Sequence, residues 1–294
     1  MIALPSSFFL SNELLISAFK ATIITAICCT IAQIVVYTTL VRHRQAKASD
    51  EKLHCLKTSH QATNALMNVV FGLCGTYICL TFHFQNPDEP ILLASTNYYQ
   101  DNIAHHVLGY ESFTFIVLAA MQVGYNLWNL PVGLFLVNEP LTMIFHHIFV
   151  IFTCSYSGYT SYGSRIHVPF FLGMYEISSV PLAYVNYLRD YKDWVKANKN
   201  IQVVQDVCKL LFALLFLGIR IILGSPHIHN IISATYWALT TLEIGSDGFP
   251  FLGAMWMGFA LLSHCGLAAL QYYWAFLIIK GLYRMAAPLK SKAL

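Results

Sequence analysis

Two adjacent histidines, His146 and His147, lie in the apolar run TMIFHHIFVIF at residues 142–152. An imidazole exchanges protons near neutral pH, and its neutral form can act as a general base or attack a thioester. Successive residues of a helix point about 100° apart, so the two rings cannot face one spot. Because Thr142 and Thr153 share a helix face with His146, we expect His146 to face an internal cavity and His147 to pack outward against a neighbouring helix.

Glu176 is the only acidic residue near the middle of a long apolar stretch. An ionisable group at membrane depth is costly and is by default a functional hypothesis. Pro181 frees the carbonyl of Ile177, which predicts an irregular helix beside the carboxyl group. We expect Glu176 to share the cavity with His146 and to orient the ring or stabilise its charged form. These three residues, His146, His147 and Glu176, are the catalytic candidates; the alternative for Glu176 is a protonated, hydrogen-bonded acid that locks two helices.

Polar residues recur three or four positions apart in several of the apolar stretches. Residues at this spacing share one helix face. Since lipid offers them no hydrogen-bond partner, these faces must turn inward, which predicts a polar central cavity. The alternative is that the amides only bond neighbouring helices together. The residues expected to line the cavity are His60, Asn64, Gln122, Asn126, Asn129, Ser179, His264 and Gln271.

The composition identifies the environment of these elements. Of the 294 residues, 57% are hydrophobic and only 11% are charged, whereas soluble domains carry about 25% charged residues. A helical crossing needs about 20 residues, and only helices satisfy their own peptide groups in lipid. We therefore predict an all-α, polytopic transmembrane helix bundle with about seven spans. The expected spans are 14–41, 64–85, 112–137, 141–157, 167–188, 206–224 and 251–280.

The basic residues predict how the bundle is oriented. Of the 17 Lys and Arg residues, 14 follow the first, fifth and seventh spans, whereas the connections 86–111 and 225–250 contain none. Seven spans place all three basic groups on one side, which the positive-inside rule makes the cytosol. Six or eight spans would divide the groups between the two sides. We therefore expect a lumenal N-terminus and a cytosolic C-terminus.

Several motifs occur in a recognisable order along residues 52–281. They are TSH at the start of the second span, GYNLWN before the histidine pair, GMYEISSVPLAYVNYL after it, and then LGIRII and LQYYWAFLIIKGL. In this order the chain resembles the TLC-domain family, which includes the ceramide synthases. The resemblance divides the chain into a first transmembrane helix with a basic cytosolic loop (1–51), a TLC-like transmembrane domain (52–281) and a basic cytosolic tail (282–294).

The resemblance implies an activity for the histidine pair. His146 and His147 match the histidines that ceramide synthases need for acyl transfer from acyl-CoA to a sphingoid amine. It implies acyl-CoA as a co-substrate, with no bound cofactor and no metal. The family's Tyr-Asp is Tyr125-Asn126 here, and Glu176 is the only acid on the helix after the pair. In this respect the chain is closer to the wider TLC-domain proteins, which carry Glu-Xaa-Ser on that helix.

Two functions remain open from the sequence. The first is a lipid N- or O-acyltransferase of the ceramide-synthase type. The alternative is a non-catalytic lipid-binding protein that tunes membrane lipid composition or serves as a structural subunit of a membrane complex. The retained histidine pair favours the first, and the absent carboxylates favour the second. The expected partners are membrane lipids and a second copy of the chain or a membrane complex, with no nucleic acid.

Three further features predict location and local structure. The C-terminal sequence KSKAL, with Lys290 and Lys292, resembles the retrieval signals of endoplasmic-reticulum membrane proteins. Segment 225–250 is too long for a turn, and we expect an interfacial or re-entrant helix there. Two further histidine pairs and a nearby histidine are expected at an interface rather than at a metal, which needs three or four converging ligands. These histidines are His83, His105, His106, His227 and His229.

Overall fold

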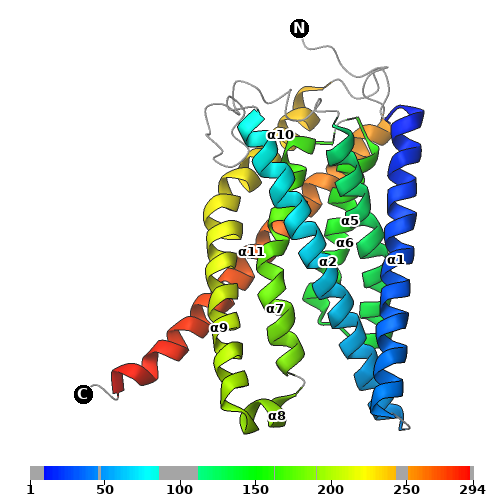
Figure 1. Cartoon of the computed structure of the whole chain (residues 1–294). Coiled ribbons are helices and arrows are strands. Elements are labelled where there is room, and N and C mark those ends of the chain that lie inside the picture. The colour runs from blue at the N-terminus through cyan, green and yellow to red at the C-terminus, as the bar shows by residue number, and fades with distance from the viewer. Residues whose placement is uncertain are drawn as a thin grey trace.

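The computed structural model describes residues 10–45, 48–85, 112–161, 163–189, 191–242 and 251–291, and the elements in these ranges are all helical (Figure 1). Seven helical segments are long and apolar enough to cross a membrane, which confirms the predicted fold class and the number of spans. The elements are α1 (Asn12–Arg44), α2 (Ser49–Gln85), α5 (Phe113–Pro131), η1 (Val132–Val137), α6 (Leu141–Tyr159), η2 (Arg165–His167), η3 (Phe170–Met174), α7 (Glu176–Arg189), α8 (Lys192–Ala197), α9 (Lys199–Leu215), η4 (Phe216–Leu223), α10 (Gly224–Thr241) and α11 (Phe251–Ser291).

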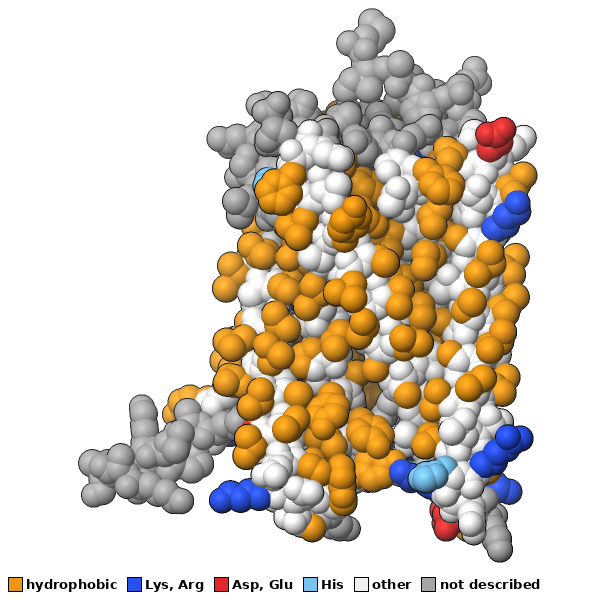
Figure 2. All heavy atoms as spheres, in the orientation of Figure 1, with side chains coloured by type: hydrophobic (Ala, Val, Ile, Leu, Met, Phe, Trp, Pro, Cys, Tyr) orange, Lys and Arg blue, Asp and Glu red, His pale blue; other side chains and the backbone are white. Residues whose placement is uncertain are grey.

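The described members of the three basic groups lie at the same end of the bundle. The α1–α2 connection and α8 lie at the bottom of Figure 1, and the C-terminal part of α11 leaves the bundle toward the same end. Lys and Arg side chains gather there in Figure 2, while apolar side chains cover the surface between the two ends. We call this end the basic end. An apolar belt of this kind is what a lipid environment requires.

Two segments are longer than expected from hydropathy alone. Helix α2 begins at Ser49 rather than at residue 64, because its more polar first turns continue the span toward the basic end, where Cys55 and Ser59 are buried. Helices α9, η4 and α10 form one helical segment, Lys199–Thr241. A helix is present at 225–241, as expected, and it continues η4 as α10; its interfacial or re-entrant position stays a prediction, and residues 243–250 lie outside the described residues. Small side chains of α10, Ala234 and Ala238, pack against Ala254, Met257 and Ala260 of α11 and draw α10 into the bundle.

Three short π-helices interrupt the spans. Segment η1 follows Pro131, η3 lies directly before α7, and η4 separates α9 from α10. The irregular backbone expected beside Glu176 is present, but it is η3, on the N-terminal side of the carboxyl group. Pro181 lies within regular α7 instead. Such π segments are frequent at functional sites because they re-aim the side chains that follow.

A direct backbone contact fixes η3 against α2. A Cβ atom added to Gly75 would overlap the backbone of Gly173, and the same holds in reverse. Around this contact, Phe71, Cys79 and Phe170 contribute to the largest buried apolar cluster of the bundle. Only glycine at both positions allows the two backbones to approach this closely. The contact sets the position at which α7 begins, and hence that of Glu176.

Candidate functional site

A cavity of about 740 Å³ lies within the bundle, between α2, α5, α6, α7, α9 and α11. Its lining reaches exposed residues of the basic end, among them Asn138, Pro140 and Arg189, so it opens toward that end. The structure brings all the site residues expected from the sequence into this one lining. They are His60, Asn64, Gln122, Asn126, Asn129, His146, His147, Glu176, Ser179, His264 and Gln271.

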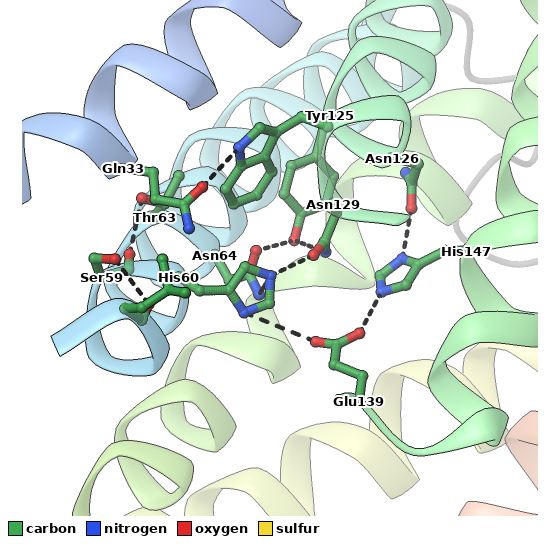
Figure 3. Close-up of polar contacts among 12 residues, drawn as sticks. Gln33, Ser59, His60, Thr63, Asn64, Tyr125, Asn126, Asn129, Glu139 and His147 are labelled. Carbon is green, nitrogen blue, oxygen red and sulfur yellow. Dashed lines mark hydrogen bonds and ion pairs between the residues drawn. The ribbon is translucent and has the colours of Figure 1, made fainter. Parts of the chain in front are cut away.

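His147 is held on both sides, as Figure 3 shows. Its Nδ1 lies 2.8 Å from Asn126 Oδ1, and its Nε2 lies 3.2 Å from Glu139 Oε2. The amide of Asn126 is fixed because its Nδ2 donates to the backbone oxygen of Gln122 at 2.8 Å. Its oxygen therefore faces His147, and Nδ1 must donate the proton. The remaining ring nitrogen and the carboxylate of Glu139 then share one proton between them.

His60 approaches the same carboxylate from α2. Its Nε2 lies 2.6 Å from Asn129 Oδ1, and its Nδ1 lies 3.9 Å from Glu139 Oε1. Asn129 is oriented by donating to the hydroxyl of Tyr125 at 3.3 Å, and Tyr125 donates in turn to Asn64 at 3.1 Å. His60 Nε2 is therefore the donor to Asn129, and its Nδ1 faces the carboxylate. Glu139 thus lies between two imidazoles from different helices (Figure 3).

Glu139 was not among the residues expected from the sequence. It lies in the short connection between η1 and α6, where Asn138 adopts a left-handed backbone (φ 55°). The amide N–H of Glu139 donates to the carbonyl of Gly133 at 2.9 Å, which turns the side chain back under the cavity. A Cβ on Gly133 would lie 2.7 Å from Glu139 Oε2, so glycine there makes room for the carboxylate. The sequence feature that could have identified Glu139 is its position as an acidic residue directly before the helix that carries the histidine pair.

His146 is the less constrained member of the pair. Its ring lies edge-on to His147 (5.6 Å between centroids) and to Trp274 of α11 (5.5 Å). It lines the cavity and is partly exposed, as expected. In the described part of the chain its Nδ1 is buried without a hydrogen bond, and no side chain or backbone group binds Nε2. Nε2 is therefore the nitrogen that is open to the cavity.

The expectation that His147 packs outward is wrong, because both rings line the cavity. The 100° divergence between neighbouring residues holds, but the cavity wraps around the start of α6. On one side its wall is α5 and the Glu139 connection, which receive His147. On the other side it is α11, which receives His146.

Glu176 has a different partner from the one expected. Its Oε2 lies 3.8 Å from Arg220 Nη2, and no contact with His146 is present among the described residues. The guanidinium of Arg220 also donates to Ser178 Oγ and Ser179 Oγ, both at 2.8 Å, and to the backbone oxygen of Tyr175 at 3.1 Å. Ser179 lines the cavity as predicted, and its hydroxyl is held by Arg220. The ion pair therefore joins α7 to η4.

Arg220 is the second residue that sequence reasoning missed. It lies within the LGIRII motif, in the apolar middle of the sixth span, and its side chain is only 7% exposed. An isolated basic residue at that depth is as costly as an acid, so it carried the same signal as Glu176. The π-helix η4 places its side chain against the start of α7. Its guanidinium also lies over the rings of Tyr175 and Phe216, at 5.2 and 5.3 Å.

The other predicted residues have clear positions. Gln122 bridges α5 to η3 by donating to the backbone oxygen of Leu172 at 2.8 Å. His264 and Gln271 lie on the α11 wall, each about 5% exposed or less. His227 is buried beside Phe170 rather than exposed at an interface, whereas His105 and His106 lie outside the described residues. Among the residues described, no three His, Cys, Asp or Glu side chains are placed to hold a metal.

Residues 61–280 match the family model of the TLC domain. The chain belongs to the TLC-domain family. Comparison with curated proteins and with solved structures finds no match. The matched range contains the histidine pair, Glu139, Glu176 and Arg220, and it begins one residue after His60. Together with seven apolar helices, it makes this TLC-domain protein an integral membrane protein with a lipid-related role.

Proposed function

We propose that this TLC-domain protein transfers an acyl chain from acyl-CoA to a hydroxyl or amine group of a membrane lipid. The observation that carries the proposal is the open Nε2 of His146, within a buried cavity and beside His147, Glu139 and His60. A general base needs a free ring nitrogen that substrate can reach. His146 meets this requirement, whereas both nitrogens of His147 are engaged.

The reaction follows from this arrangement. Nε2 of neutral His146 takes the proton of the lipid hydroxyl or amine while its oxygen or nitrogen attacks the thioester carbonyl. The acyl–sulfur bond breaks, an acyl–oxygen or acyl–nitrogen bond forms, and the imidazolium returns the proton to the CoA thiolate. While His146 is charged, the proton shared by His147 and Glu139 moves toward Glu139, so that two adjacent imidazoles are not charged together. Glu139 therefore acts through His147.

A nucleophilic route uses the same nitrogen. Here Nε2 of His146 attacks the thioester itself, CoA leaves as the thiol, and the lipid then takes the acyl group from the ring. Only this route leaves the acyl chain on the protein. The intact mass of protein incubated with acyl-CoA alone therefore distinguishes the two routes.

The basic end of the cavity suits the CoA part of the donor. Lys57 and Arg189 line the cavity there, and Arg189 is exposed. Cations on this rim attract the phosphates of CoA, which remain in water while the acyl chain enters the apolar part of the cavity. This placement agrees with a cytosolic basic end, and the endoplasmic reticulum is the compartment that we propose from the terminal lysines.

A separate observation supports a second, non-catalytic function. Glu176 and Arg220 neutralise each other. His147 is hydrogen-bonded to Glu139, and His60 is hydrogen-bonded to Asn129 with its Nδ1 3.9 Å from the same carboxylate. Such networks also serve to lock helices together. In this alternative the cavity binds a lipid without chemistry, and the protein tunes membrane lipid composition or supports a membrane complex.

One experiment decides between them. Lipidomes of cells with and without the protein give the acylated lipid that depends on it, and the purified protein is then incubated with that lipid's deacylated form and radiolabelled acyl-CoA. We expect labelled lipid and free CoA in equal amounts. Lipid that binds to the protein while no label is transferred would replace the acyltransferase by the binding function.

A further inference from the structure

One wall of the cavity carries polar atoms that have no hydrogen-bond partner in the described part of the chain. They are His146 Nδ1, Thr153 Oγ1, both ring nitrogens of His264 and Gln271 Oε1. Three of these side chains, those of Thr153, His264 and Gln271, are 6%, 5% and 4% exposed. Burying an unpaired polar atom costs stability. Four such residues lining one cavity therefore indicate hydrogen-bond partners that come with a ligand. We call them the polar row.

The polar row lies on two adjoining helices, α6 and α11. The rings of His146 and Trp274 lie 5.5 Å apart, and those of Phe152 and Phe259 lie 5.7 Å apart. From the first contact to the second, the residue number rises on α6 and falls on α11, so the two helices run antiparallel. A Cβ on Gly266 of α11 would overlap the ring of Phe149 of α6, so the two helices are in close contact between these points.

The spacing of the row is the same on both helices. His146 and Thr153 are seven residues apart on α6, and His264 and Gln271 are seven residues apart on α11. Seven residues are two helical turns, or about 10 Å. The antiparallel contacts place Gln271 near the level of His146 and His264 near the level of Thr153. The row therefore has two levels, each with one residue from each helix.

The chemistry of the row does not fit an anionic ligand group. A histidine ring and a threonine hydroxyl each donate and accept, and Gln271 Oε1 only accepts. A phosphate offers acceptors only and cannot pair with Gln271 Oε1. The charged groups of the cavity interior are already matched, since Glu139 lies between two histidines and Glu176 pairs with Arg220. The row therefore fits an uncharged group that both donates and accepts.

We propose that the polar row binds the uncharged headgroup, bearing hydroxyl or amide groups, of the lipid that accepts the acyl chain. Its first level includes His146, whose other ring nitrogen is open to the cavity, so a hydroxyl bound there lies beside the proposed base. Naming this lipid as the acceptor rests on the proposed function. The binding itself requires no catalysis and is measured without acyl-CoA.

The test uses the full-length protein in phosphatidylcholine nanodiscs and tritiated 1-monooleoylglycerol, which carries two hydroxyl groups. Thr153→Val and Gln271→Leu remove the row's hydrogen-bonding atoms with little change of volume. Thr76→Val is the matched control, because Thr76 also has a buried, unpaired hydroxyl but does not line the cavity. Oleoyl lysophosphatidic acid, with the same chain and a charged headgroup, is the ligand control.

We expect saturable binding of monooleoylglycerol that weakens about fivefold in each row variant and is unchanged in Thr76→Val. We also expect the ligand-free melting temperature of both row variants to stay or rise, because an unpaired buried polar atom has been removed. Equal binding by wild type and row variants would overturn the proposal and leave water as the partner of the row. Two further results would also overturn the proposal. One is binding of lysophosphatidic acid as tight as that of monooleoylglycerol, and the other is a fall in the melting temperature of the row variants that accounts for their lost binding.

Discussion

At the scale of single residues, the site depends on which ring nitrogens of His146 and His147 are hydrogen-bonded and which are open. The amide of Asn126, fixed by the Gln122 carbonyl, assigns the proton of His147 Nδ1 and so leaves its Nε2 to Glu139. The ring of His146 lacks such partners and keeps Nε2 open. One histidine is therefore suited to hold a proton and the other to exchange protons with substrate.

Glu139→Gln tests the shared proton. The amide keeps the shape of the carboxylate but cannot take up the proton from His147. We expect kcat for acyl transfer to fall about 100-fold, with the KM for acyl-CoA unchanged and a changed pH dependence of kcat. Asp206→Asn, at an exposed acid paired with Lys209, is the control and should leave both constants unchanged. An unaltered kcat in Glu139→Gln would remove Glu139 from the mechanism.

Arg220→Ala tests the buried ion pair. The substitution leaves the carboxylate of Glu176 without its cation and three oxygen acceptors without their donor. We expect a loss of about 3 kcal/mol of stability, measured by reversible unfolding in mixed micelles. Glu176→Gln in the same chain should restore part of it. Lys209→Ala breaks a half-exposed pair and should cost less than about 1 kcal/mol. Similar losses in both single variants would contradict a structural role for the pair.

At the scale of elements, the site is built where helices depart from regular geometry. Segment η1 and the left-handed Asn138 turn Glu139 under the cavity, η3 precedes Glu176, and η4 carries Arg220. The backbone contact between Gly75 and Gly173 holds η3 against α2. The ion pair then links the start of α7, which follows η3, to η4.

Gly75→Ala tests this contact. An added methyl group meets backbone atoms of Gly173 and Met174, which no rotamer change can relieve. We expect a destabilisation of about 2 kcal/mol and a lower rate of acyl transfer, because the start of α7 must shift. Gly258→Ala on α11 is the control, since nothing lies within 4 Å of its added Cβ. If Gly75→Ala is as stable and active as the control, the contact does not position the site.

The sequence pattern predicts most of the helices and their inward faces. The site residues that it missed have a common cause. The length and polarity of the apolar runs predict the spans, and the four-residue spacing of the amides predicts which faces turn inward. Glu139 and Arg220 were missed because their roles depend on a left-handed turn and on π-helices, which regular helical spacing does not contain. The inward direction of His147 depends on how far the cavity extends around α6, which is a property of the assembled bundle.

At the scale of the whole molecule, the distribution of charge predicts the orientation. The basic end should face the cytosol, where acyl-CoA is dissolved. A cysteine at Ala48 or Lys199 should react with a membrane-impermeant reagent from the cytosolic side. A cysteine at the exposed Tyr236 of α10, or a glycosylation acceptor near residue 95, should report the lumen. Cytosolic labelling at Tyr236 would contradict the orientation.

The most direct test of the central claim is acyl transfer by the purified protein with His146→Ala. The substitution removes the open nitrogen and leaves Asn126, Glu139 and His147 in place. We predict that the variant accumulates and melts like the wild type but transfers labelled acyl chains at least about 100-fold more slowly. The exposed His43→Ala variant should match the wild type. Transfer by His146→Ala at the wild-type rate would contradict the account.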